Sequence, residues 1–310
     1  MPRGAERAAP GRTLGILFAA LGALGFACKA ILVKIAYGLG ADPITLLALR
    51  MLYALPCFIV MGLVAQYGAT APLRRADYSA LLGLGLIGYY ASSYLDFLGL
   101  QYVSASLERV ILFVYPTLVV LIGAWLKRRA PSRPVLAGVI FCYAGVVTTF
   151  LNHLQRGAGQ VAIGGALVFA SAVCFAVYLL GSAPLLQRLG TTRVTAWATG
   201  FASLAVLAQF AVLRPAVSLV AQPARVQGLA ILMALFCTVL PIWLVAEAIR
   251  RLGAGPAAVI GSMGPVYTMV LAYLLLGEPL GPWQLLGAAL VIFGVRLISR
   301  PAEAGRTAAA

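Results

Sequence analysis

Charged residues are scarce in this sequence. Only 10% of its 310 residues are Asp, Glu, Lys or Arg, and eight of them are acidic, whereas an ordinary soluble domain carries about 25% charged residues. Hydrophobic residues make up 62% of the chain, which is more apolar surface than a soluble fold of this length could hide. The composition therefore excludes an ordinary soluble protein and indicates an integral membrane protein.

Residues that metal sites and nucleophilic enzymes need are also few. The only histidine is His153, the five cysteines lie apart in apolar blocks without CxxC spacing, and no HExxH or GxSxG motif occurs. No metal site, cofactor or disulfide framework is predicted. A membrane-embedded enzyme is the least favoured class, and no ATP-binding loop is recognised, so energy for transport would come from gradients.

Long apolar blocks separated by short polar breaks fill the chain. Each block is close to the roughly 20 helical residues that cross about 30 Å of hydrocarbon. We predict ten transmembrane helices, near residues 14–37, 44–66, 78–100, 104–126, 134–151, 162–187, 193–213, 226–250, 256–277 and 282–299. The first block contains two lysines and is too long for a signal peptide, so we interpret it as a retained helix.

The positive charges lie mainly in the breaks on one side of the predicted membrane. Arg74, Arg75, Lys127 and Arg128 are among many on the side of the termini, while only Arg156, Arg214 and Arg225 fall on the other. The bias of Lys and Arg towards cytoplasmic loops predicts that both termini are cytoplasmic, in a bacterial inner membrane. The net charge of +15 thus indicates membrane topology and no nucleic-acid partner.

The two halves of the sequence are related at an offset of 149 residues. Pro116 then matches Pro265, and Gly138 matches Gly287. Because each half has five spans, the second half must insert upside down relative to the first, as in many secondary transporters. We predict a first repeat at 1–152, with a cytoplasmic tail at 1–13, and a second repeat at 153–310, with a tail at 300–310. The expected fold is all-α, with two inverted five-helix repeats around a central cavity.

One stretch carries a recognisable motif. "LLLGEPLGPWQLLGAALVIFGV" (274–295), with Gly277, Glu278 and Pro279 after the ninth span, resembles the EamA-type drug/metabolite transporters. The resemblance implies a ten-helix bundle that moves small metabolites, with amino-acid exporters among its members. The first repeat departs from the family pattern, because it has Lys127, Arg128 and Arg129 where a Gly-Glu pair often occurs.

Five charged residues lie at similar depth in the predicted outer half of the membrane. They are Lys34, Arg50, Asp96, Glu108 and Arg109. Ionised groups inside a membrane normally face the bundle interior and pair with one another. They either form fixed structural pairs, with Lys34 reaching the interface, or line the outer mouth, where they act as a closing latch or bind a zwitterion. Arg50 and Asp96 are the preferred members of such a site.

Helical spacing places polar residues of two spans on common faces. Tyr89, Ser93 and Asp96 share one face, and Glu108 and Tyr115 share another. Lys29 lies deeper, where it could bind a substrate carboxylate or pair with a carboxylate of another helix. The predicted substrate-binding set is Lys29, Arg50, Tyr89, Ser93, Asp96, Glu108, Arg109, Tyr115, Trp243 and Tyr267.

Two prolines at matching repeat positions are expected to bend their helices. Pro116 and Pro265 each lack an N–H donor in mid-span. With Gly264, they are candidate hinges, and static kinks are the alternative. Glu247, near a helix end, is expected to pair with Arg250 or Arg251.

The sequence as a whole predicts a secondary transporter. It would move a small metabolite, most simply an amino acid or similar zwitterion, by alternating access, with export as the expected direction. Its partners would be the lipid bilayer and the substrate, and a proton or substrate gradient is a candidate driving force. The alternatives are a channel or structural membrane protein and, with less support, an enzyme.

Overall fold

The computed structural model describes residues 10–67, 72–128, 130–154, 158–252, 257 and 260–298. Every regular element in these ranges is a helix. Eight helical stretches are long and apolar enough to cross a membrane, and two shorter apolar helices, Gly264–Leu276 and Pro282–Ile298, complete the set. The predicted tail at 300–310, most of the tail at 1–13 and the predicted start of the ninth span lie outside the described residues.

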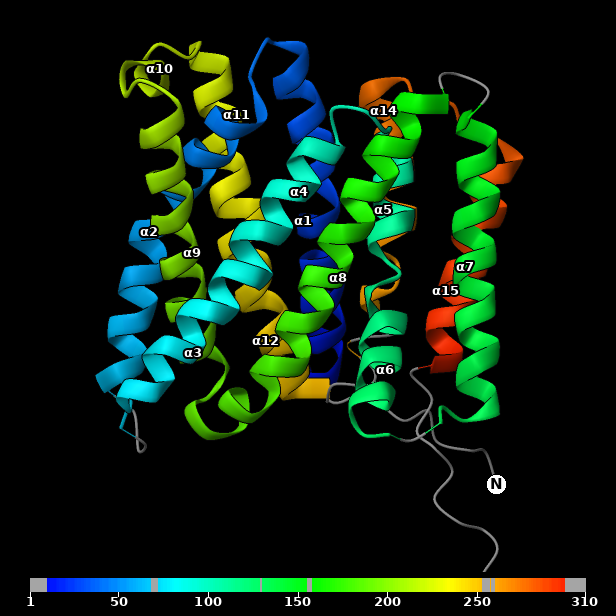
Figure 1. The fold of residues 1–310 in the computed structure, drawn as a ribbon, viewed down its shortest axis with the longest axis horizontal. Helices are drawn as coiled ribbons and strands as arrows, with labels where there is room; N and C mark the ends of the chain where they lie inside the picture. Colours follow the sequence, from blue (N-terminus) through cyan, green and yellow to red (C-terminus); the bar gives the residue numbers. More distant parts are fainter. Residues whose placement is uncertain are drawn as a thin grey trace, which may run out of the picture.

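The helices stand side by side in an upright bundle (Figure 1). The first half contains α1 (Pro10–Gly38), α2 (Pro43–Tyr67), α3 (Arg75–Gly85), η1 (Leu86–Ala91), α4 (Ser92–Gly99), α5 (Ala105–Leu112), α6 (Tyr115–Leu126) and α7 (Arg133–Leu154). The second half contains α8 (Ala158–Leu189), α9 (Thr191–Leu213), α10 (Val217–Val220), α11 (Ala224–Ala234), η2 (Leu235–Val239), α12 (Leu240–Leu252), α14 (Gly264–Leu276) and α15 (Pro282–Ile298). Apart from the ninth span, the predicted span ends agree with these helices to within four residues.

The bundle has two ends. We call the end at which α1 begins and α15 ends the terminal end, and the opposite end, at which α14 ends and α5 begins, the far end (Figure 1). The short helix α10 at the far end was not predicted. It is only four residues long, so hydrophobic periodicity could not reveal it.

The two prolines interrupt their spans instead of bending continuous helices. Helix α5 ends at Leu112 and α6 begins at Tyr115, because Pro116 cannot donate the helical hydrogen bond. In the gap the Val114 N–H bonds the Ile111 carbonyl oxygen at 3.1 Å. The second half has the same turn before α14, where Met263 N–H bonds the Ile260 oxygen at 3.1 Å. The predicted kink is therefore a break in the helix at both positions.

Backbone irregularities recur at the offset seen in the sequence. The π-helices begin at Leu86 and Leu235, 149 residues apart. A residue with left-handed backbone conformation follows α6 and another follows α14. They are Arg128, with φ 49°, and Gly277, with φ 66°, and they are again 149 residues apart. With the two helix breaks, three unusual features match. The halves are therefore related in backbone conformation as well as in sequence.

Glycines on α7 and α15 show that the halves are inverted. A Cβ atom at Gly138 would lie 2.7 Å from the Gly294 oxygen, and one at Gly145 would lie 2.5 Å from the Gly287 oxygen. Gly287 and Gly294 are the repeat counterparts of Gly138 and Gly145, so each contact is the two-fold image of the other. The helices run antiparallel side by side (Figure 1), as the inverted repeat requires.

This glycine contact supports a stability prediction. Gly287→Ala places a methyl group 1.9 Å from the Thr149 hydroxyl oxygen and 2.7 Å from the Gly145 oxygen. The helices must separate, so we expect a loss of roughly 1–3 kcal/mol. Gly228→Ala is the matched control, because nothing lies within 4 Å of its Cβ position, and it should be neutral or slightly stabilising. Denaturant unfolding in detergent measures both; equal stabilities would contradict the assigned packing.

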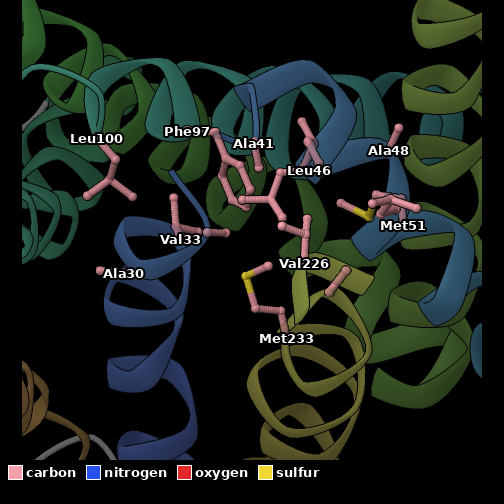
Figure 2. Close-up of a cluster of buried hydrophobic side chains, with 14 of the residues drawn as sticks. Ala30, Val33, Ala41, Leu46, Ala48, Met51, Phe97, Leu100, Val226 and Met233 are labelled. Carbon is pink, nitrogen blue, oxygen red and sulfur yellow. The ribbon is translucent and has the colours of Figure 1, made fainter. Parts of the chain in front are cut away.

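A large apolar cluster lies between α1, α2, α4 and α11. Figure 2 shows Val33, Leu46, Phe97 and Met233 converging there, and all four are at most 1% exposed. On the opposite part of α1, Gly15, Gly22 and Gly25 contact α12 closely, as expected for small residues at helix contacts. Because Phe97 is buried in this cluster, its neighbour Asp96 is held inside the bundle.

Candidate functional site: a buried charge cluster

The fourth span positions two of the predicted charges. Ser104 caps α5, with its hydroxyl oxygen accepting a bond of 3.1 Å from Leu107 N–H. Every residue from Ala105 to Ile111 is buried. Glu108 is 0% and Arg109 6% exposed. Neither side chain therefore faces lipid. This burial explains how an apolar span can contain two charged residues.

Lys29 joins two carboxylates from different spans. Its Nζ lies 2.5 Å from Asp96 Oδ2 and 3.4 Å from Glu108 Oε1. The side-chain exposures are 15% for Lys29, 3% for Asp96 and 0% for Glu108. Of the two roles expected for Lys29, the structure contains the pairing with carboxylates of other helices. The ammonium group thus connects α1, α4 and α5.

Arg109 lies on the other side of Glu108. Its Nη2 donates a hydrogen bond of 2.5 Å to the Phe26 carbonyl oxygen, and its Nε lies 3.8 Å from Glu108 Oε2. The guanidinium is therefore directed mainly to the backbone of α1. This contact also holds α5 against α1, one turn before Lys29.

Among the described residues, Arg50 is the cation of the group that has no carboxylate within ion-pair distance. It is 5% exposed, its Nη2 lies 3.5 Å from the Ser93 hydroxyl, and its guanidinium carbon lies 5.3 Å from the centre of the Phe97 ring. No ion pair to Arg50 and no hydrogen-bond partner of its Nε occurs among the described residues. A buried guanidinium contacting only a hydroxyl and an aromatic face is incompletely compensated.

The cluster therefore carries an excess of one positive charge. Lys29, Arg50 and Arg109 supply three cations, and Asp96 and Glu108 supply two carboxylates. One oxygen of each carboxylate, Asp96 Oδ1 and Glu108 Oε2, also has no hydrogen-bond partner within the described ranges. Unpaired donors and acceptors together in a membrane interior are unusual and are a feature of ligand sites.

An aromatic cluster lies along η1, α6 and α8. The ring centres of Tyr89 and Tyr178 are 4.9 Å apart, and their hydroxyl oxygens are 3.3 Å apart. The Phe175 ring lies between Tyr178 and Tyr115, with its centre 5.9 Å from that of Tyr178 and 5.1 Å from that of Tyr115. The Tyr178 ring packs on the backbone of Gly88, where a Cβ atom would lie 2.3 Å from it. The π-helix η1 thus provides the space for an aromatic side chain from the second repeat.

Two further aromatic residues were predicted to belong to the site. Trp243 is 53% exposed and its ring lies 5.7 Å from that of Phe18, which precedes Lys29 on α1 by three turns. Tyr267 on α14 is half-buried. Glu247 pairs with Arg251 at 2.7 Å, which confirms the expected i, i+4 pair; the side chain of Arg250 is outside the described set.

Sequence reasoning missed two participants. Phe97 forms the aromatic face beneath Arg50, and the Phe26 carbonyl oxygen binds Arg109. Phe97 follows Asp96 directly and could have been noticed as its neighbour, but apolar residues surround every charge in this chain. A backbone carbonyl leaves no signal in the sequence. Within the described ranges no group of three metal-ligating side chains occurs.

The fold and site define an α-helical membrane protein of ten spans, built from two inverted units around a buried charge cluster. The EamA-like transporter family matches residues 13–151 and 162–300, one copy for each half. The chain belongs to this family. It is a membrane transporter and not an enzyme.

Several proteins resemble it over most of their length. The chain is 31% identical over 282 residues to a Bacillus subtilis protein described as uncharacterized transporter YcbK, covering 90% of each chain. It is 27% identical to uncharacterized transporter sll1319 of Synechocystis, covering 92% of this chain and 93% of that one. A solved crystal structure superposes with a TM-score of 0.65 at 16% identity, covering 92% and 96% of the two chains. That likeness shows the fold alone.

Proposed function

We propose that this transporter moves a small zwitterionic metabolite, of the amino-acid type, by alternating access. The observation that carries the proposal is a complementary pair of unpartnered groups. In the part of the chain that the structure describes, Arg50 Nε is a buried donor without an acceptor, and Asp96 Oδ1 is a buried acceptor without a donor. A molecule with a carboxylate and an ammonium group would satisfy both.

The two groups belong to packed elements. Arg50 contacts Ser93 and Phe97 of α4, and Asp96 lies between these two residues in the chain. A carboxylate bound to a guanidinium makes charge-assisted hydrogen bonds, which are stronger than neutral ones. An ammonium group at Asp96 would share that carboxylate with Lys29, so substrate and Lys29 would compete for one anion.

Alternating access is supported by the matched breaks in the two halves. Discontinuous helices at corresponding positions of inverted repeats are typical of secondary transporters, whose substrate sites lie near those breaks. Glu108 and Arg109 lie one turn before the break after Leu112. The two units are thus suited to exchange conformations around the cluster.

We assign the terminal end to the cytoplasm. Loops there carry Arg74, Arg75, Lys127 and Arg128, and such loops are favoured on the cytoplasmic side. This assignment supports a bacterial inner-membrane protein whose substrate leaves at the far end. A channel is the alternative function, and it predicts flux without exchange.

Counterflow in proteoliposomes tests the proposal. Vesicles are loaded with one unlabelled compound and diluted into a solution of the same compound in labelled form. The compounds are a panel of amino acids, sugar phosphates and organic cations. We expect saturable, transient accumulation for members of the amino-acid group. Flux that never exceeds equilibration would indicate a channel, and exchange of cations alone would contradict the role given to Arg50.

A further inference from the structure

Glu278 connects the two inverted units at the far end. It follows the left-handed Gly277 that ends α14. Its Oε1 accepts a hydrogen bond of 2.7 Å from Ala105 N–H, and its Oε2 accepts bonds from Ser106 N–H at 3.1 Å and the Ser106 hydroxyl at 2.7 Å. One carboxylate of the second unit therefore binds the beginning of α5 in the first unit.

This contact is chemically strong. The first N–H groups of a helix have no partner within the helix, and the helix dipole favours a negative charge beside them. Ser104 already binds Leu107 N–H, so Glu278 provides acceptors for the two remaining donors of the first turn. Ala105 is 0% and Ser106 4% exposed. Separating the units here would leave these buried donors without acceptors.

The same contact controls the position of the charge cluster. Helix α5 carries Glu108 and Arg109 only two and three residues after Ser106. Because α5 is one short rigid segment that ends at the break after Leu112, its first turn cannot move without moving Glu108. Release of Glu278 would therefore free the far end of the segment that bears two of the five charges of the cluster.

The sequence at the other end differs at the matching positions. The repeat counterpart of Glu278 is Arg129, and the counterpart of Ala105 is Ala254; both lie outside the described residues, and only their identities enter here. An arginine side chain has donors and no acceptor, so it cannot bind helix N–H groups. Yet Arg128 and Gly277 adopt the same left-handed conformation. The repeats thus agree in backbone at this position and differ in charge.

An ion pair also joins the units at the terminal end. Arg188 of α8 pairs with Asp77 of α3. The Asp77 side chain is 6% exposed and the arginine side chain 36%, so solvent screens the arginine charge in part. The three bonds of Glu278 to a buried helix start are the stronger connection.

We propose that Glu278 is a one-sided gate latch, which closes the far end and makes the far-closed conformation the resting state of the transporter. This inference rests on the alternating access proposed above. Glu278 acts as a positioning residue through α5 and does not touch the substrate. Since the counterpart of Glu278 in the other repeat is an arginine, loss of Glu278 should shift the population towards the conformation that opens at the far end.

Hydrogen–deuterium exchange of the full-length protein in lipid nanodiscs tests the latch without a substrate. The readouts are two sets of amides, at the start of α5 at the far end and at the start of α3 at the terminal end. In Glu278→Gln, exchange at the far end should rise about tenfold, on the scale of a hydrogen bond to a charged acceptor. Exchange at the terminal end should fall, because that end now spends more time closed.

The opposite sign at the two ends separates a latch from a merely local contact. Faster exchange at α5 with no change at the terminal end would show that Glu278 only stabilises its own surroundings, and would overturn the proposal. Ser106→Ala, which removes one of the three bonds, should give a smaller shift of the same sign. Glu247→Gln, which removes the α12 ion pair at the terminal end, is the matched control and should leave α5 unchanged.

Two further variants test whether the latch is one-sided. Arg129→Glu supplies a carboxylate at the counterpart position and should shift exchange in the same direction as Glu278→Gln. An opposite shift of equal size in Asp77→Asn would show that the terminal end has a latch of its own and would refute the one-sided model. A third outcome separates the latch from the substrate proposal. If no compound of the panel gives counterflow but hydrogen exchange still changes in opposite directions at the two ends, the proposed substrate is contradicted and the latch is supported.

Discussion

Lys29→Met is expected to lower the free energy of unfolding by roughly 3–5 kcal/mol and to abolish transport, since breaking a buried ion pair leaves an uncompensated charge. Lys29 is the only cation within 4 Å of Asp96 among the described residues, and it also lies 3.4 Å from Glu108. Removing its charge leaves two buried carboxylates on adjoining helices, and among the described residues only Arg109 then lies within 4 Å of either of them. Denaturant unfolding and proteoliposome exchange measure the two effects.

A second substitution identifies the source of the instability. In Lys29→Met/Asp96→Asn the unpaired anion is gone, so the double variant should recover much of the lost stability. Transport should stay absent, because Asp96→Asn removes the carboxylate proposed to bind the substrate ammonium group. If the double variant is as unstable as the single one, the loss comes from packing around residue 29, and the electrostatic explanation fails.

Arg50→Gln is expected to reduce transport by about 100-fold while leaving the fold nearly intact. Because Arg50 has no carboxylate partner among the described residues, its loss leaves no anion unpaired. Stability should change by no more than about 1 kcal/mol, the scale of the contact with the Phe97 ring. The transport loss reflects the missing charge-assisted bonds to the substrate carboxylate, at 1.4 kcal/mol for each factor of ten.

Two arginine variants serve as comparisons. Arg214→Gln removes an exposed arginine that lies 3.6 Å from Asp42 at the far end, so both transport and stability should stay close to normal. Arg50→Lys keeps the charge and loses the planar, two-pronged geometry, and it should be intermediate. Normal exchange in Arg50→Gln would remove Arg50 from the substrate site, whatever its burial.

Lys29 and Arg50 together distinguish a structural charge from a binding charge. Both are cations in the same cluster, yet within the described part of the chain one joins two carboxylates and the other contacts a hydroxyl and an aromatic ring. Large instability is expected only where an opposite charge is left behind. A transporter needs both kinds, because fixed pairs hold the helices and an unpaired group can bind cargo.

The fold could be predicted from the sequence in considerable detail. Spans showed as apolar blocks because lipid imposes length and hydrophobicity directly on each helix. The offset from Pro116 to Pro265 revealed the repeat, and an odd number of spans required its inversion. The π-helices at Leu86 and Leu235 were not predicted, since no residue pattern distinguishes them from α-helix within an apolar run.

The site could be predicted only as a set of residue types. Lys29, Asp96 and Glu108 were recognisable because charges in apolar spans are rare and must find polar surroundings. Their partners could not be predicted from the sequence. Helical periodicity indicates on which face of its helix a residue lies, but it does not indicate which other helix packs against that face. The bond from Arg109 to the Phe26 carbonyl oxygen involves a backbone atom that any residue supplies.

The sequence by itself determined that this chain spans a membrane ten times, in two related and oppositely inserted halves, with five charges placed at one depth. These features follow from composition, length and parity, which act on each span separately. Only the tertiary structure decided that Lys29 joins the two carboxylates, that Arg50 pairs with none among the described residues, and that Glu278 binds the start of α5. Such pairings depend on the distance between side chains from different spans, and that distance exists only after the helices have packed.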